Sequence, residues 1–297
     1  MSSSRTNGPA TALALAAMPA VFVLLWSTGF IGAKLGLPYV EPVTFLIIRF
    51  ASVTVLLALF AAVTGAPWPK SWAEAGHIAV AGLLLQAVYL GGVFASIHHG
   101  VPAGISALIV GIQPLLVAAA AGSFLGEQVT LRQWAGLALG LGGVVLVVWT
   151  KLDLGVGSLL GYGLSVLALL GITLGTLYQK RYCPRLDLRS GNAIQYGITT
   201  LALAPFALAF ETRQVIWSGE LVFALAWLCI VLSLGAISLL FVLIRRGAAA
   251  QVSSLFFLVP PCTAVVAYFL FGETLSLLAL LGMGVTMIGV ALVNLKR

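Results

Sequence analysis

The chain has 297 residues, of which 61% are hydrophobic and 8% are charged, with a formal net charge of +7. This composition excludes a soluble domain, because a water-exposed surface needs many more charged residues. The basic residues are spread over short breaks between apolar runs, so they do not indicate a nucleic-acid partner. We expect an integral membrane protein in contact with the lipid bilayer.

Long apolar runs follow one another along the whole chain. A helix that crosses a bilayer needs about 20 apolar residues, and the first run is too long for a removable signal peptide. All eight Asp and Glu residues fall in breaks between the runs. The sequence therefore predicts an all-α membrane protein with ten transmembrane helices: 12–37, 43–65, 76–97, 101–125, 131–150, 156–181, 190–210, 221–244, 248–271 and 275–295.

Lysine and arginine are divided unevenly between the two ends of these helices. If the helices alternate in direction, eleven basic residues lie on one side, and Lys34, Arg49, Lys151 and Arg213 lie on the other. The richer side is expected to be cytoplasmic. The pattern predicts cytoplasmic N- and C-termini in a plasma membrane, such as the bacterial inner membrane.

The first helix carries Trp26, Phe30 and Lys34 four residues apart, on one helix face. A charged side chain in or near hydrocarbon either lines a watery cavity or extends to the interface. Both interpretations of Lys34 stay open. Trp26 lies near mid-span rather than in an interfacial belt, which favours a cavity wall.

Polar residues in later helices extend the candidate substrate site. Gln86 and Tyr89 are three residues apart in the third helix, and a buried amide needs a partner on a neighbouring helix or on a substrate. Tyr178, Ser238 and Phe241 predict a mildly polar, aromatic surface in the second half. The Ser signal is weak, because a hydroxyl also bonds to its own helix carbonyls.

Three prolines are predicted in the middle of helices: Pro114, Pro260 and Pro261. A mid-helix proline frees the carbonyl four residues earlier, such as that of Val110 or Phe256. These sites are candidates for gating bends or substrate contacts, or for simple packed kinks.

Small residues recur in the fifth and tenth helices. They allow two helices to approach closely in lipid, so we expect these helices to form a scaffold pair or a self-association face. The residues are Gly136, Gly140, Gly282, Gly284 and Gly289.

The chain resembles itself at an offset of about 146 residues. GEQVTLRQWAG (126–136) aligns with GETLSLLALLG (272–282), and Lys34 aligns with Lys180. Two units follow, 1–150 and 151–297, with five helices each. Because five is odd, the second unit enters the membrane from the opposite side, an inverted repeat typical of transporters with a central cavity. Thr130 and Gln133 fit a capping box, so the Glu127 and Glu273 turns are expected to be structural first.

Catalytic and metal-binding patterns are missing from the sequence. We find no nucleophile–base–acid set, no HExxH and no phosphate-binding glycine loop, and the three cysteines are far apart. We therefore expect a protein that is not an enzyme and holds no cofactor or metal. The lack of an acid within the spans also disfavours proton antiport.

Three stretches carry a resemblance to a known family: LLWSTGFIGAKLGLPYVEPVTFLIIRF (24–50), GISALIVGIQPLLVAAAAGSFLGEQVTLRQWAGLALGLGGVVLV (104–147), and the region of PPCTAVVAYFLFGETLS. They resemble the drug/metabolite transporter superfamily, and its ten-helix EamA-type members most. The resemblance implies two inverted five-helix units, a cavity lined mainly by helices 1, 3, 4, 6, 8 and 9, and helices 5 and 10 at the rear. The small four-helix multidrug members use a glutamate in their first helix that this chain lacks, which puts drug antiport in doubt.

The combination of aromatic faces, an amide, hydroxyls and one cation suits a small zwitterion. We expect export of amino acids, including aromatic and apolar ones, by alternating access with facilitated or exchange transport. The alternatives are transport of another small metabolite, a sugar or a drug, and, outside transport, a membrane scaffold or a lipid-acting enzyme.

Overall fold

The computed structural model describes residues 9–101, 103–149, 157–271 and 275–295. The predicted boundary between residues 150 and 151 lies outside them. Within the described part the chain is helical, and its extended pairing is one isolated antiparallel bridge between Val40 and Val215. The elements are α1 (Pro9–Gly36), α2 (Pro42–Val63), α3 (Trp72–Gly82), η1 (Leu83–Gly91), α4 (Gly92–His98), α5 (Ala103–Val110), α6 (Gln113–Leu125), α7 (Leu131–Val148), α8 (Leu159–Tyr182), α9 (Ser190–Phe210), α10 (Gly219–Trp227), η3 (Leu228–Ala236), α11 (Ile237–Arg246), α12 (Ala249–Ser254), η4 (Leu255–Leu258), α13 (Val259–Phe271) and α14 (Leu277–Asn294).

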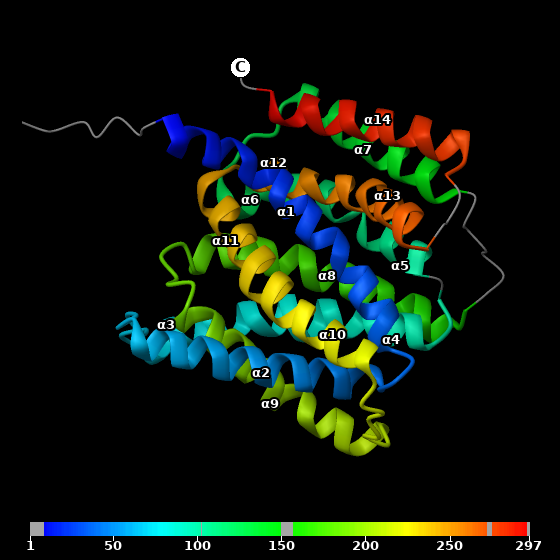
Figure 1. Ribbon diagram of the computed structural model, residues 1–297. Helices are drawn as coiled ribbons and strands as arrows, with labels where there is room; N and C mark the ends of the chain where they lie inside the picture. The colour runs from blue at the N-terminus through cyan, green and yellow to red at the C-terminus, as the bar shows by residue number, and fades with distance from the viewer. Residues whose placement is uncertain (1–8, 102, 150–156, 272–274, 296–297) are drawn as a thin grey trace, which may run out of the picture.

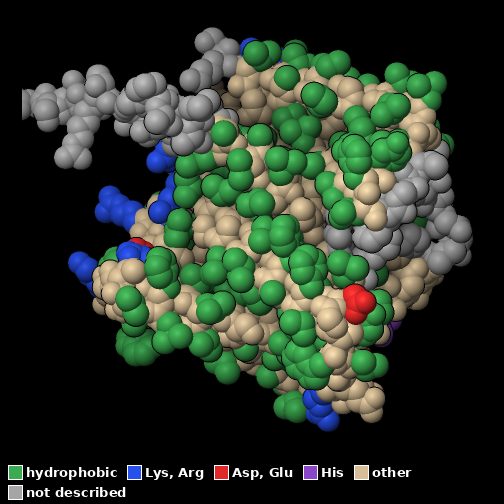
Figure 2. Space-filling model, in the orientation of Figure 1, with side chains coloured by type: hydrophobic (Ala, Val, Ile, Leu, Met, Phe, Trp, Pro, Cys, Tyr) green, Lys and Arg blue, Asp and Glu red, His purple; other side chains and the backbone are tan. Residues whose placement is uncertain are grey.

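These elements join into membrane-length spans. Over the described residues, nine spans are long and apolar enough to cross a bilayer, and α1 contains a shorter apolar stretch, Ala17–Gly29. The predicted all-α membrane fold is confirmed. Figure 2 shows hydrophobic side chains over most of the visible face, with most of the visible Lys and Arg side chains at the end where α3 begins and α11 ends.

The spans lie side by side, with α7 and α14 paired at one edge of the bundle and α2 and α9 paired at the opposite edge (Figure 1). The glycines explain the first pair. A Cβ added to Gly136 would lie 2.7 Å from the Gly289 carbonyl oxygen, and one added to Gly282 would lie 2.6 Å from the Gly143 carbonyl oxygen. Backbone meets backbone here, so the expected scaffold pair is present.

Several spans are not regular α-helices. Nine residues in the middle of the third span (η1) and nine in the middle of the eighth (η3) are π-helical, a form often found at functional sites. The fourth span is interrupted at Gly111 and Ile112, between α5 and α6.

The three predicted mid-helix prolines lie in the first turns of helices that follow a break in the span. Pro114 occupies the first turn of α6, where a missing N–H costs little. Pro260 and Pro261 lie in the first turn of α13, directly after the 3₁₀ segment η4. The Phe256 carbonyl accepts the Val259 amide, so the expectation of a free carbonyl at Phe256 is wrong: the tighter turn supplies a donor.

The predicted capping box at Thr130 is confirmed. The Thr130 hydroxyl accepts from the Gln133 amide at 3.3 Å, and the Gln133 side-chain oxygen accepts from the Thr130 amide at 2.9 Å. The Glu127 carboxylate accepts from the Ala249 amide at 2.8 Å and pairs with Lys180. Glu127 therefore ties the α6–α7 turn to the start of α12.

Candidate functional site

A small cavity of about 40 Å³ lies in the middle of the bundle. Space of this size holds about one water molecule, so this state has no room for an organic substrate. Its walls come from α1, η1, α4, α5, α6, α7, α8, η4 and α13. The lining residues are Trp26, Tyr89, Val93, Ala107, Val110, Gly111, Gln113, Val144, Ile172, Phe256, Val259 and Pro260.

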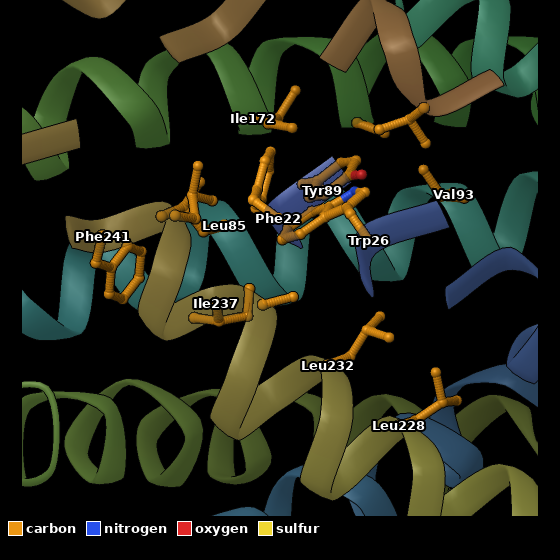
Figure 3. Packing of buried hydrophobic residues seen from close by; sticks show 14 of the residues in the cluster. Phe22, Trp26, Leu85, Tyr89, Val93, Ile172, Leu228, Leu232, Ile237 and Phe241 are labelled. Carbon is orange, nitrogen blue, oxygen red and sulfur yellow. The ribbon is translucent and has the colours of Figure 1, made fainter. Parts of the chain in front are cut away.

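Aromatic rings close one side of this cavity. The Trp26 ring centroid is 5.3 Å from that of Phe22 and 5.2 Å from that of Phe256, the latter pair edge to face. Tyr89 also lines the cavity, and its side chain neighbours that of Trp26 (Figure 3). Both side chains are buried. The arrangement offers flat apolar faces to a ligand.

A buried amide and a helix break supply polarity. The Gln113 side chain donates from Nε2 to the Ser253 hydroxyl at 3.1 Å, while its Oε1 has no partner among the described groups. Val110 and Gly111 line the cavity where α5 ends. Irregular backbone at membrane depth is found where it borders a cavity, so this wall can bind a polar group.

The structure brings three of the predicted site residues together: Trp26, Tyr89 and Pro260 all line the cavity. Gln86 is fully buried but is not part of the lining, and neither of its amide atoms has a hydrogen-bond partner in the described structure. Pro114 and Pro261 are buried next to lining residues. The side chains of Phe30 and Lys34 lie outside the described part of the chain.

The three remaining candidates lie elsewhere. The Tyr178 hydroxyl is 2.7 Å from His77 Nδ1, and the His77 ring stacks on Tyr182. Phe241 packs in the core at 1% exposure, away from Trp26 and Tyr89 (Figure 3). Ser238 borders a different, open groove.

That groove has a volume of about 570 Å³. Arg189 donates to the Asp187 carboxylate from Nε at 3.1 Å and from Nη2 at 2.9 Å. These hydrogen bonds hold the pKa of Asp187 below its ordinary value. The groove combines charged groups with apolar walls: Leu56, Leu57, Phe60, Asp187, Leu188, Arg189, Leu234, Ser238 and Arg245.

A buried polar cluster escaped the sequence reasoning. Arg49 was expected on the side of the membrane that has fewer basic residues. In the structure its side chain is buried within the bundle, on α2, at 2% exposure. Its electrostatic neighbour Tyr196 belongs to a polar stripe on the otherwise apolar helix α9. That stripe was the signal available in the sequence: Asn192, Gln195, Tyr196 and Thr199.

Comparison with known proteins agrees with this architecture. The EamA-like transporter family matches the chain twice, over residues 12–149 and 159–295. The inner membrane transporter YedA of Escherichia coli (strain K12) is 28% identical over 279 residues, covering 92% of this chain and 88% of YedA. A probable amino-acid metabolite efflux pump of Salmonella typhimurium is 24% identical over 276 residues, covering 90% of each chain.

A solved crystal structure superposes with a TM-score of 0.78 at 17% identity, covering 93% of this chain and 95% of that one. That likeness supports the fold. The two family matches leave few residues outside them, and the described part of the chain has nine helices of membrane-spanning length. The chain belongs to the EamA-like transporter family, within the drug/metabolite transporter superfamily, and is a multi-pass membrane transporter.

Proposed function

We propose that the protein exports amino acids, including aromatic and apolar ones. The observation that carries this proposal is the central cavity, which Trp26 and Tyr89 line with aromatic side chains and Gln113 with an amide whose Oε1 has no partner among the described groups. Flat apolar walls suit an apolar side chain, and the polar wall suits an ammonium group. The Salmonella relative named as an amino-acid metabolite efflux pump supports the same substrate class.

Alternating access between two inverted five-helix halves is the mechanism we propose. The cavity must enlarge before it can hold an amino acid, and the breaks at Gly111–Ile112 and at η4 border it on two sides. These non-α segments supply points where a helix can bend. None of the lining residues is an acid, which favours facilitated or exchange transport over proton coupling, and a carrier role over an enzymatic one.

Counterflow in proteoliposomes tests the proposal. Vesicles loaded with unlabelled amino acids should take up labelled phenylalanine and methionine saturably without a pH gradient. Trp26→Ala should lower this uptake at least about tenfold, the equivalent of about 1.4 kcal/mol, because it removes one aromatic wall. Leu24→Ala, at a side chain 55% exposed on the same helix, is the matched control and should transport normally.

Other outcomes would contradict the proposal. Uptake of a sugar or a cationic drug alone would assign a different substrate class to the same cavity. Uptake that requires a proton gradient would contradict the uncoupled mechanism. Failure to transport any compound of the panel, together with activity on lipid, would favour a lipid-acting enzyme.

A further inference from the structure

Arg49 is a cation inside the bundle that has no matching anion among the described residues. It lies near the start of α2 at 2% exposure, and an arginine side chain keeps its charge even when buried. Its Nε and Nη2 atoms both donate to the hydroxyl oxygen of Ser233, at 3.1 and 3.0 Å. Across the described residues, the ion pairs of the chain involve other cations. One neutral hydroxyl and the Phe50 ring, whose centroid is 5.6 Å from the guanidinium carbon, do not balance a buried charge.

The groups around Arg49 are also incompletely bonded. The Tyr196 hydroxyl faces Ser233 and Gln86 but makes no hydrogen bond of normal geometry to either. Both Gln86 amide atoms are also unpartnered within the described structure. A partly satisfied polar network is costly in a low-dielectric interior. A ligand whose oxygen atoms form hydrogen bonds with these groups would complete the network and explain why it is there.

The position of the cluster links it to the central cavity. Tyr89 lines the cavity and is an electrostatic neighbour of Arg49. The cluster also joins the two π-helical segments, because Gln86 and Tyr89 belong to η1 and Ser233 belongs to η3. Tyr89 therefore borders the cavity and lies within electrostatic range of the guanidinium.

We propose that Arg49 binds the carboxylate of the transported molecule. Guanidinium is the side chain best matched to a carboxylate, and the Gln86 amide and Tyr196 hydroxyl supply two further donors. The inference rests on the proposed function and deepens it: Trp26 and Tyr89 contact the apolar side chain of the amino acid while Arg49 holds its carboxylate. The cation of the site is then a residue of the second span.

The decisive variant is Ser233→Asp, which places a carboxylate where Arg49 now finds a hydroxyl. The purified protein is melted in detergent with L-phenylalanine, with phenylacetate as a bare carboxylate, or with phenylalaninamide, which lacks one. Wild type should be stabilised by the two carboxylates and not by the amide. Ser233→Asp should melt several degrees higher without ligand, because the charge is balanced, and should lose the response to both carboxylates.

Ser233→Asn has a similar size and no charge, so it should keep the preference for carboxylate over amide. Arg49→Gln should lose that preference, and Ser233→Asp remains informative if Arg49→Gln fails to fold. The inference is overturned if wild type responds equally to phenylalanine and its amide, if no carboxylate stabilises wild type, or if Ser233→Asp still responds to phenylacetate.

The melting assay separates this inference from the transport proposal. Arg49-dependent stabilisation by phenylacetate in a protein that transports no amino acid would retain the carboxylate site and reject amino-acid export. Transport of phenylalanine and phenylalaninamide at equal rates, in wild type and in Arg49→Gln, would retain a carrier and reject the site.

Discussion

Glu211 shows how a single loop carboxylate positions a transmembrane helix. Its two oxygens accept from the Val43 and Thr44 amides and from the Thr44 hydroxyl, each at 2.7 Å. These amides belong to the first turn of α2, whose N–H groups lack partners inside the helix. Glu211 therefore links the end of α9 to the start of α2, the helix that carries Arg49.

Removal of this carboxylate should destabilise the protein. We expect Glu211→Ala to lower the free energy of unfolding by about 1–2 kcal/mol, the usual effect of losing a helix cap with a favourable charge. Thermal melting in detergent measures it. Glu220→Ala, at an exposed carboxylate in the first turn of α10, should cost less; equal losses for the two variants would show that the three hydrogen bonds contribute little.

The close packing of α7 against α14 depends on the glycines that lie on the contact face of each helix. Glycines on the other faces are not needed for this packing. A Cβ on Gly143 would lie 2.5 Å from the Thr286 amide nitrogen and 2.7 Å from the Gly282 carbonyl oxygen, whereas Gly142 has nothing within 4 Å. Backbone atoms cannot rotate away as a side chain can. Adjacent residues of one helix thus have opposite tolerance for a methyl group.

We expect Gly143→Ala to destabilise the protein by about 1–3 kcal/mol through overpacking. Gly142→Ala should be neutral or stabilising by up to about 1 kcal/mol, because alanine favours a helix. Melting both variants in the same detergent gives the comparison. A Gly143→Ala variant as stable as Gly142→Ala would mean that the two helices separate without cost.

The distribution of charge over the whole molecule predicts its orientation in the membrane. Arg185 precedes α9 and Gln214 follows it, so the two exposed positions lie at opposite ends of one span. The excess of basic residues at the Arg185 end predicts that this end is cytoplasmic.

Cysteine labelling in intact cells tests this orientation. Gln214→Cys should react with a membrane-impermeant maleimide, and Arg185→Cys should react only after the cells are opened. Cys183 should add little background at the Arg185 end, because burial raises the pKa of its thiol to about 11 and a protonated thiol reacts slowly. The reverse labelling pattern would place the termini outside the cytoplasm.

Hydrophobic length, capping and small-residue spacing are local properties, so the sequence predicts the helical spans, the capping box at Thr130 and the glycine contact between the fifth and tenth spans. It also placed Trp26 and Tyr89 in one cavity. Only the tertiary structure separated Gln86 from that cavity, since η1 is π-helical and alters the spacing of side chains around the helix. Likewise, only packing revealed Arg49 as a buried cation, because its hydrogen-bond partner Ser233 lies 184 residues away. The sequence shows which groups are polar, and the fold decides which of them meet.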